Sequence, residues 1–114
     1  MAVDLSALSP SKIVPPMLAA AKDTAGGAWA DIKTTVTIEF KAIATRIKEI
    51  GRAVANDEIN AATAKMLMKM VKNNVISAIA LVTNQVLIAV EKIVNAALRM
   101  IRDVVNAAIG IPLV

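Results

Sequence analysis

The sequence predicts an all-α protein: a long helical hairpin that associates with further copies of itself in a coiled-coil-like oligomer. Three observations lead there. The 114 residues are 57% hydrophobic, above the roughly 45–50% of ordinary globular chains. Apolar residues recur at helical spacings of three and four, and no proline lies between residues 17 and 111. A monomer this small has a high ratio of surface to volume and cannot bury so many apolar side chains by itself. We therefore expect partner helices, a lipid surface or self-assembly.

The first half of the chain predicts an arm followed by two helices. Residues 1–16 hold three of the four prolines and are expected to form an extended N-terminal arm, ahead of a single helical domain at 17–114. A short helix is expected at 17–25, because Gly26-Gly27 can end it. An amphipathic helix is expected at 28–55, where apolar residues from Ile32 to Val54 follow spacings of three and four.

The second half predicts one long helix over 57–109, about 52 residues or roughly 78 Å. Asn56-Asp57-Glu58 provides a cap and first-turn acids, and no proline or glycine follows before Gly110. Such length without an internal cap is typical of coiled coils. The apolar rows before and after this start are out of phase by one residue, which is about 100° of rotation. The chain is therefore expected to turn between about Gly51 and Asn60 and form a helical hairpin.

The long segment carries an eleven-residue repeat. In blocks of eleven from Ala62, positions three, seven and ten are always apolar, and this period favours straight or slightly right-handed packing. Between Val75 and Val90 the helix would be apolar almost all round, so burial from more than one side is expected. The predicted oligomer interface comprises Val75, Ile79, Val82, Val86, Val90, Ile93, Ile101 and Val104.

Position one of each block is asparagine, at Asn73, Asn84, Asn95 and Asn106. A polar residue at a fixed position can set the register between packed helices, so this row is interpreted as a register ladder. The alternative is a hydrated stripe on the solvent face.

Positive charge is concentrated where the hairpin turns. Residues 41–72 have a net charge of +4 and the rest of the chain has none. This basic tip can serve nucleic acid, anionic lipid or an acidic neighbour, or it can simply keep an apolar molecule soluble. Met66, Met68 and Met70 lie in the same stretch, where flexible thioethers form either an adaptable binding surface or core filling. The tip comprises Lys41, Arg46, Lys48, Arg52, Lys65, Lys69 and Lys72.

Catalytic chemistry is not expected. The chain has no His and no Cys, which removes the commonest general base and metal ligand. Its carboxylates are isolated apart from Asp57-Glu58, and no phosphate loop or metal cluster occurs. We expect no enzyme activity, no cofactor, no metal and no small-molecule substrate. The opening residues hold an acid at Asp4 and no apolar run, so we expect no signal peptide and a location in the cytoplasm or within an assembled particle.

These features favour a non-enzymatic structural subunit that self-assembles into a filament, tube, shell or helical bundle. Small alanine-rich helical chains are found among phage and virion subunits and bacterial assemblies. This likeness is one of composition and assigns no role to any residue. Two alternatives stay open. One is an amphipathic lipid-surface or membrane-active protein, and the other is a structural protein that coats nucleic acid through the basic tip.

Overall fold

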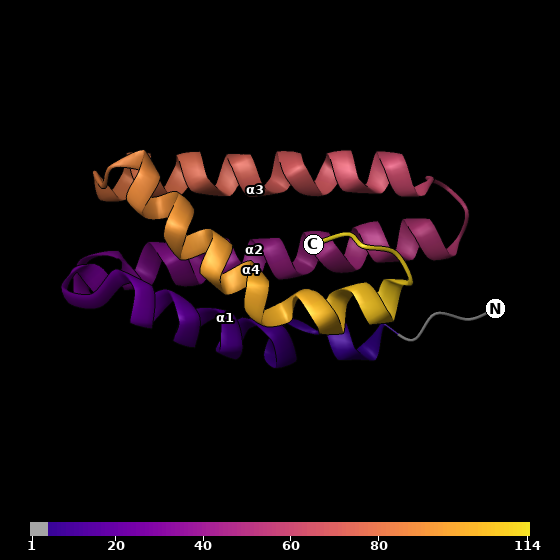
Figure 1. Ribbon diagram of the computed structural model, residues 1–114, viewed down its shortest axis with the longest axis horizontal. Coiled ribbons are helices and arrows are strands. Elements are labelled where there is room, and N and C mark those ends of the chain that lie inside the picture. The colour runs from indigo at the N-terminus through magenta and orange to yellow at the C-terminus, as the bar shows by residue number, and fades with distance from the viewer. Residues whose placement is uncertain (1–4) are drawn as a thin grey trace.

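The computed structural model describes residues 5–114, which are almost entirely helical and include no strand (Figure 1). The predicted all-α class is therefore confirmed. The chain forms a bundle of 46 × 23 × 18 Å whose helices run alternately up and down. Its elements are η1 (Ser6–Leu8), α1 (Pro10–Ala25), η2 (Gly26–Ala28), α2 (Trp29–Ala55), α3 (Ala61–Thr83) and α4 (Leu87–Ile109).

The four helices are not equally covered by one another. α1 packs on α2 and α4, and α3 packs along α2. α4 begins beside the end of α3 and then crosses diagonally toward α1 (Figure 1). Within the described chain, α1 and α3 do not approach each other. As a result α3 forms one edge of the bundle, and a groove lies between α3 and α4.

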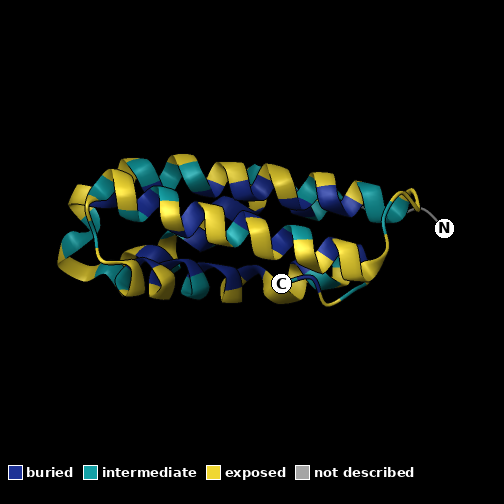
Figure 2. Ribbon diagram, turned by 90° about the horizontal axis from the view of Figure 1, so that it is seen from above, coloured by how far each residue is buried: buried dark blue, intermediate teal, exposed yellow. Residues whose placement is uncertain are grey.

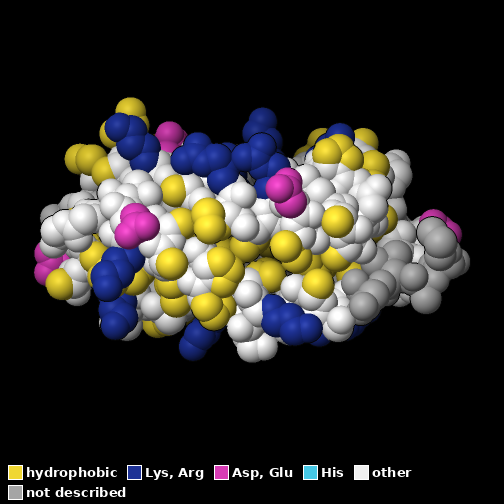
Figure 3. Space-filling model, turned by 60° about the horizontal axis from the view of Figure 1, so that its bottom comes forward, with side chains coloured by type: hydrophobic (Ala, Val, Ile, Leu, Met, Phe, Trp, Pro, Cys, Tyr) yellow, Lys and Arg dark blue, Asp and Glu magenta, His cyan; other side chains and the backbone are white. Residues whose placement is uncertain are grey.

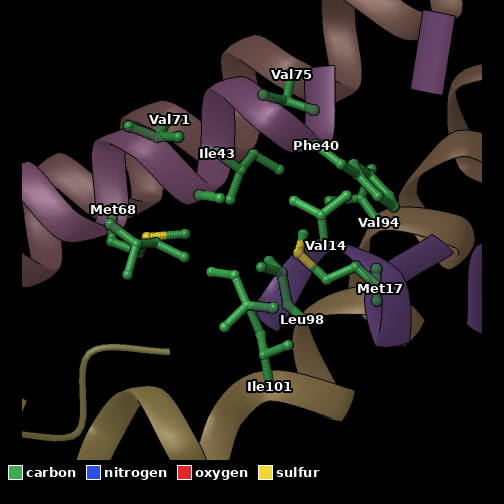
Figure 4. Close-up of a cluster of buried hydrophobic side chains, with 14 of the residues drawn as sticks. Val14, Met17, Phe40, Ile43, Met68, Val71, Val75, Val94, Leu98 and Ile101 are labelled. Carbon is green, nitrogen blue, oxygen red and sulfur yellow. The ribbon is translucent and has the colours of Figure 1, made fainter. Parts of the chain in front are cut away.

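All four helices contribute to one hydrophobic core. Figure 4 shows buried side chains from all four helices in one cluster, among them Val14 and Met17 of α1, Phe40 of α2, Met68 of α3 and Val94 of α4. Figure 2 shows that the buried positions lie on the inward sides of the helices, while exposed positions face out. No buried side chain in the described part of the chain is charged or polar. The fold is thus held chiefly by apolar burial, at about 1.5–3 kcal/mol for each fully buried aliphatic side chain.

The predicted extended arm is wrong over residues 10–16. These residues form the first half of α1, and Pro10 occupies the start of the helix after the extended residue Ser9. Pro15 and Pro16 lie inside the helix, where each costs the backbone a hydrogen bond. Burial of Ile13, Val14 and other α1 side chains offsets that cost. Residues 1–4 of the predicted arm lie outside the described residues.

The predicted single helix over 57–109 is also wrong. The chain turns at Asn84, whose φ of 58° is left-handed, and α4 starts after the extended residue Val86. The Asn84 and Gln85 N–H groups both donate to the Ala80 carbonyl, which closes the end of α3. The turn lets eight α4 residues reach the core. That burial outweighs the few helical hydrogen bonds that the break removes.

The remaining predicted boundaries hold more closely. α2 agrees with the predicted helix at 28–55, and the chain turns between Gly51 and Asn60 as the phase slip requires. The next helix starts later than predicted, because Asn60 rather than Asn56 or Asp57 is its N-cap. The Asn60 Oδ1 accepts the Thr63 N–H at 2.8 Å. α2 and α3 thereby form the antiparallel hairpin.

Candidate functional site

One candidate site is the outer strip of α3, the row that points directly away from the core. Met66, Met70 and Leu81 are 66%, 54% and 82% exposed. Asn73 and Ser77 lie between them on the same side of the helix and are also exposed. The strip is therefore an uncharged and largely apolar row along the uncovered edge of the bundle.

A second exposed apolar feature adjoins the strip at the α3–α4 turn. This apolar turn consists of Val82, Val86, Leu87 and Ile88, each more than half exposed. No charged residue occurs between Lys72 and Glu91. The Val86 side chain offers no cap to the first N–H groups of α4. The strip and the turn together leave a charge-free apolar surface that the chain itself does not cover.

The composition of α3 agrees with this picture. It is the one helix in the described chain that is long and apolar enough to cross a membrane by length and composition alone, with a mean hydropathy of 1.2. Only 28% of its apolar 18-residue stretch is buried inside the protein. α3 thus exposes more of its apolar character than a helix at the centre of a bundle would.

The predicted oligomer interface is divided by the turn at Asn84. Val75 and Ile79 of α3 face the intramolecular core, as do Val90, Ile93 and Ile101 of α4. Val82, Val86 and Val104 remain exposed. The eleven-residue repeat therefore identifies the face of each helix that meets the rest of this chain. The expectation that the whole row contacts other copies is wrong for the buried members.

The predicted asparagine ladder does not form one row. Asn73 lies on the outer strip of α3, Asn84 forms the turn and Asn95 lines the α3–α4 groove. The Asn106 amide binds the Val114 backbone, accepting its N–H at 2.9 Å and donating to its carbonyl at 3.3 Å. The ladder prediction fails because it requires an unbroken helix. The four side chains instead have four different surroundings.

The structure distributes the predicted basic tip over separate surfaces. Lys65, Lys69 and Lys72 line the groove between α3 and α4. Lys41 and Arg46 line a groove on the opposite side of α3, between α2 and α3. Lys48 and Arg52 line neither groove. The residues share the half of the bundle that holds the α2–α3 loop, but they do not form a single patch.

The α3–α4 groove gathers two further cations that sequence reasoning missed, Arg99 and Arg102 of α4. The turn at Asn84 brings them opposite the α3 lysines. Their spacing of three residues does place both arginines on one helix face, but this signal identifies no partner without the turn. We call this set the basic groove: Lys65, Lys69, Lys72, Arg99 and Arg102.

Residues 5–114 contain no cluster of side chains that could ligate a metal ion. No group of three or more acidic, His or Cys side chains there is placed to hold a metal ion. The described side chains also include no buried polar atom that lacks a hydrogen-bond partner.

Comparison with known protein families, with curated proteins and with solved structures found no match. The candidate sites are therefore the outer strip of α3 with the adjoining apolar turn, and the basic groove.

Proposed function

We propose that this chain is a non-enzymatic structural subunit that associates with a second copy of itself through the outer strip of α3. The observation that carries the proposal is the uncharged, largely apolar strip from Met66 to Leu81 on a helix that the bundle leaves uncovered. Contiguous exposed apolar surface of this kind marks an interaction site. The charges of α3 decide which partner fits this strip.

The charges of α3 favour an antiparallel copy. Lys65 and Lys69 lie in its first half and Lys72 at its middle, and residues 73–83 carry no charge. In an antiparallel pair, each lysine-bearing half lies beside the partner's charge-free half. A parallel pair would instead place each lysine beside its own equivalent, where like charges repel. Antiparallel packing also brings Lys65 near the carbonyl end of the partner's α3, which attracts cations.

The strip is symmetric about its middle, as such a pair requires. Met66 would lie opposite the partner's Leu81, and Met70 opposite the partner's Ser77. Asn73 would lie beside the partner's Asn74 at the two-fold axis, where amide side chains can pair and fix the register. Each bulky apolar side chain thus faces either another apolar side chain or a small one.

The size of the strip implies modest affinity. α3 spans 23 residues, which gives a contact about 35 Å long and about 10 Å wide. That is smaller than the roughly 800 Å² per partner of a standard interface. We therefore expect a dimer with a micromolar dissociation constant, and larger assemblies would need additional contacts at the apolar turn.

Sedimentation velocity over about 1–200 µM protein tests the proposal. We expect concentration-dependent dimers for the native chain and monomers for Leu81→Lys. The matched control is Ile38→Lys on α2, which removes another exposed apolar side chain, itself 61% exposed, and adds the same charge. A monomeric native chain at every concentration would contradict the proposal, and so would equal loss of dimer in both variants.

A second candidate function is reversible attachment to a lipid surface, and the apolar turn favours it. Its four exposed side chains lie at one end of the bundle, in a stretch of sequence without charged residues, and such groups partition into the membrane interface. Figure 3 shows that apolar side chains also reach the surface between Lys and Arg side chains over α1 and α4. Flotation with neutral phosphatidylcholine vesicles, abolished by Leu87→Asp together with Ile88→Asp, would favour this function over self-association.

A further inference from the structure

The basic groove lies on a different side of α3 from the outer strip and has a volume of about 520 Å³. Its walls carry Lys65, Lys69 and Lys72 from α3, and Arg99 and Arg102 from α4. The groove has no acidic residue in its lining. It thus concentrates five cations in one concave surface of a chain whose total net charge is +4.

None of these cations forms an ion pair with another residue in the described part of the chain. Among residues 5–114 the one ion pair is Arg46 with Glu49, at 3.6 Å, and it lies outside the groove. Like charges gathered on two facing walls repel one another. A bound anion would remove this repulsion and gain charge-assisted hydrogen bonds from several side chains.

The floor of the groove differs chemically from its rim. Met68 and Leu98 line it from the two helices, and Leu113 reaches it from the segment after α4. All three are at least nine-tenths buried. Asn106 holds that segment in place through its two hydrogen bonds to Val114. A ligand in the groove therefore meets apolar atoms below and a ring of cations above.

We propose that the basic groove binds a small phosphate-bearing ligand with more than one negative charge and an apolar portion. The phosphate oxygens accept hydrogen bonds from the lysines and from the guanidinium groups of Arg99 and Arg102, which suit bidentate binding of oxyanions. The apolar portion lies against Met68 and Leu98. The volume suits one ligand of ordinary cofactor size. A lipid headgroup and a soluble organic phosphate share this chemistry.

The dimensions favour a small ligand over a nucleic-acid strand. The α3 lysines lie within an eight-residue stretch, 65–72, or about 10 Å along the helix, which is room for only a few phosphates at the spacing of a nucleic-acid strand. The cations also converge in a concave groove and do not follow an extended track. In the described chain, aromatic residues on which bases could stack are limited to Trp29 and Phe40, and neither lines the groove.

Two binding measurements on the full chain distinguish the sources of phosphate. Isothermal titration with inorganic tripolyphosphate tests for a soluble ligand. Flotation with phosphatidylcholine vesicles, with and without phosphatidic acid, tests for a headgroup. We expect binding to tripolyphosphate, to the acidic vesicles or to both, and this binding should weaken as salt rises. Absence of binding to both probes at low salt would overturn the proposal.

Paired variants test whether the groove itself is responsible. Lys65→Gln with Lys69→Gln should weaken binding at least about tenfold, since each substitution removes a charge-assisted hydrogen bond to the ligand. Arg99→Gln with Arg102→Gln should do the same from the other wall. Lys12→Gln with Lys33→Gln removes the same net charge from exposed sites outside the groove, and we expect a change below about twofold.

The outcomes of this comparison are distinct. Equal weakening in the groove variants and in the control would show diffuse charge attraction and overturn the proposal. Tighter binding of duplex DNA than of either phosphate probe would also overturn it, in favour of a nucleic-acid surface. Because Arg99→Gln with Arg102→Gln leaves every residue of α3 unchanged, sedimentation of that variant tests self-association separately.

Discussion

Asn106 and Val114 bind each other reciprocally: the Asn106 Oδ1 accepts the Val114 N–H at 2.9 Å, and its Nδ2 donates to the Val114 carbonyl at 3.3 Å. This pair anchors the segment after α4 and places Leu113 in the core, where it is 6% exposed. The Asn106 side chain thus holds the segment after α4 against α4 itself.

Replacing Asn106 by Leu should release this segment. We expect the free energy of unfolding to fall by about 1–3 kcal/mol, because two hydrogen bonds are lost and the burial of Leu113 weakens. Urea denaturation measures the change. Asn95→Leu is the matched control, since the Asn95 side chain makes no hydrogen bond to any residue that the structure describes, and it should leave stability unchanged or slightly higher.

The turn at Asn84 depends on its left-handed backbone. Asn84→Val should destabilise the protein by about 1–2 kcal/mol, because a β-branched residue is strained at a φ of 58°. Asn84→Gly should be tolerated. Asn56→Val, at a φ of −91°, controls for loss of the amide. Thermal unfolding that ranked Asn56→Val as the more damaging change would contradict this assignment of the turn.

The N-cap at Asn60 provides a third test. Asn60→Ala should cost about 1 kcal/mol by removing the acceptor of the Thr63 N–H. Asn60→Asp should keep most of the stability, since a carboxylate also accepts this hydrogen bond. Chemical denaturation of both variants measures the difference. If the two variants were equally stable, the side chain would have no capping role.

Gly51 marks a close approach between α2 and α4. A Cβ at this position would lie 3.1 Å from Cγ1 of Ile109 and 3.3 Å from Cδ2 of Leu5. Gly51→Leu should therefore lower the free energy of unfolding by about 1–3 kcal/mol through overpacking. Gly27→Leu, where an added Cβ meets nothing within 4 Å, should have little effect in the same urea titration.

Sequence periodicity predicted the helical class, α2 and the α2–α3 hairpin because these depend on which residues share a helix face. It also identified the core face of α3 and α4, although it assigned that face to other copies. The periodicity could not reveal the turn at Asn84, since an apolar row continues in phase on both sides of it. Whether a long helix stays straight depends on what its second half can bury, which is a tertiary property.

The same limit explains the errors in the arm and the basic tip. Pro15 and Pro16 indicate an extended segment locally, but burial of neighbouring α1 side chains against α4 overrides that preference. The α3 lysines were recognisable from charge alone. Arg99 and Arg102 join them only because α4 folds back, so the basic groove could not be predicted from spacing along the chain.

Disulfide trapping tests the proposed antiparallel α3 pair most directly, because the chain has no cysteine of its own. Asn73→Cys lies at the proposed two-fold axis, where the two Cα atoms fall within disulfide range, so mild oxidation should give a covalent dimer. Met66→Cys alone should remain monomeric, since its two copies would lie about 22 Å apart along the pair. Met66→Cys combined with Leu81→Cys should cross-link again. Cross-linking of Met66→Cys as readily as Asn73→Cys, or a monomeric Asn73→Cys at about 100 µM, would contradict the account.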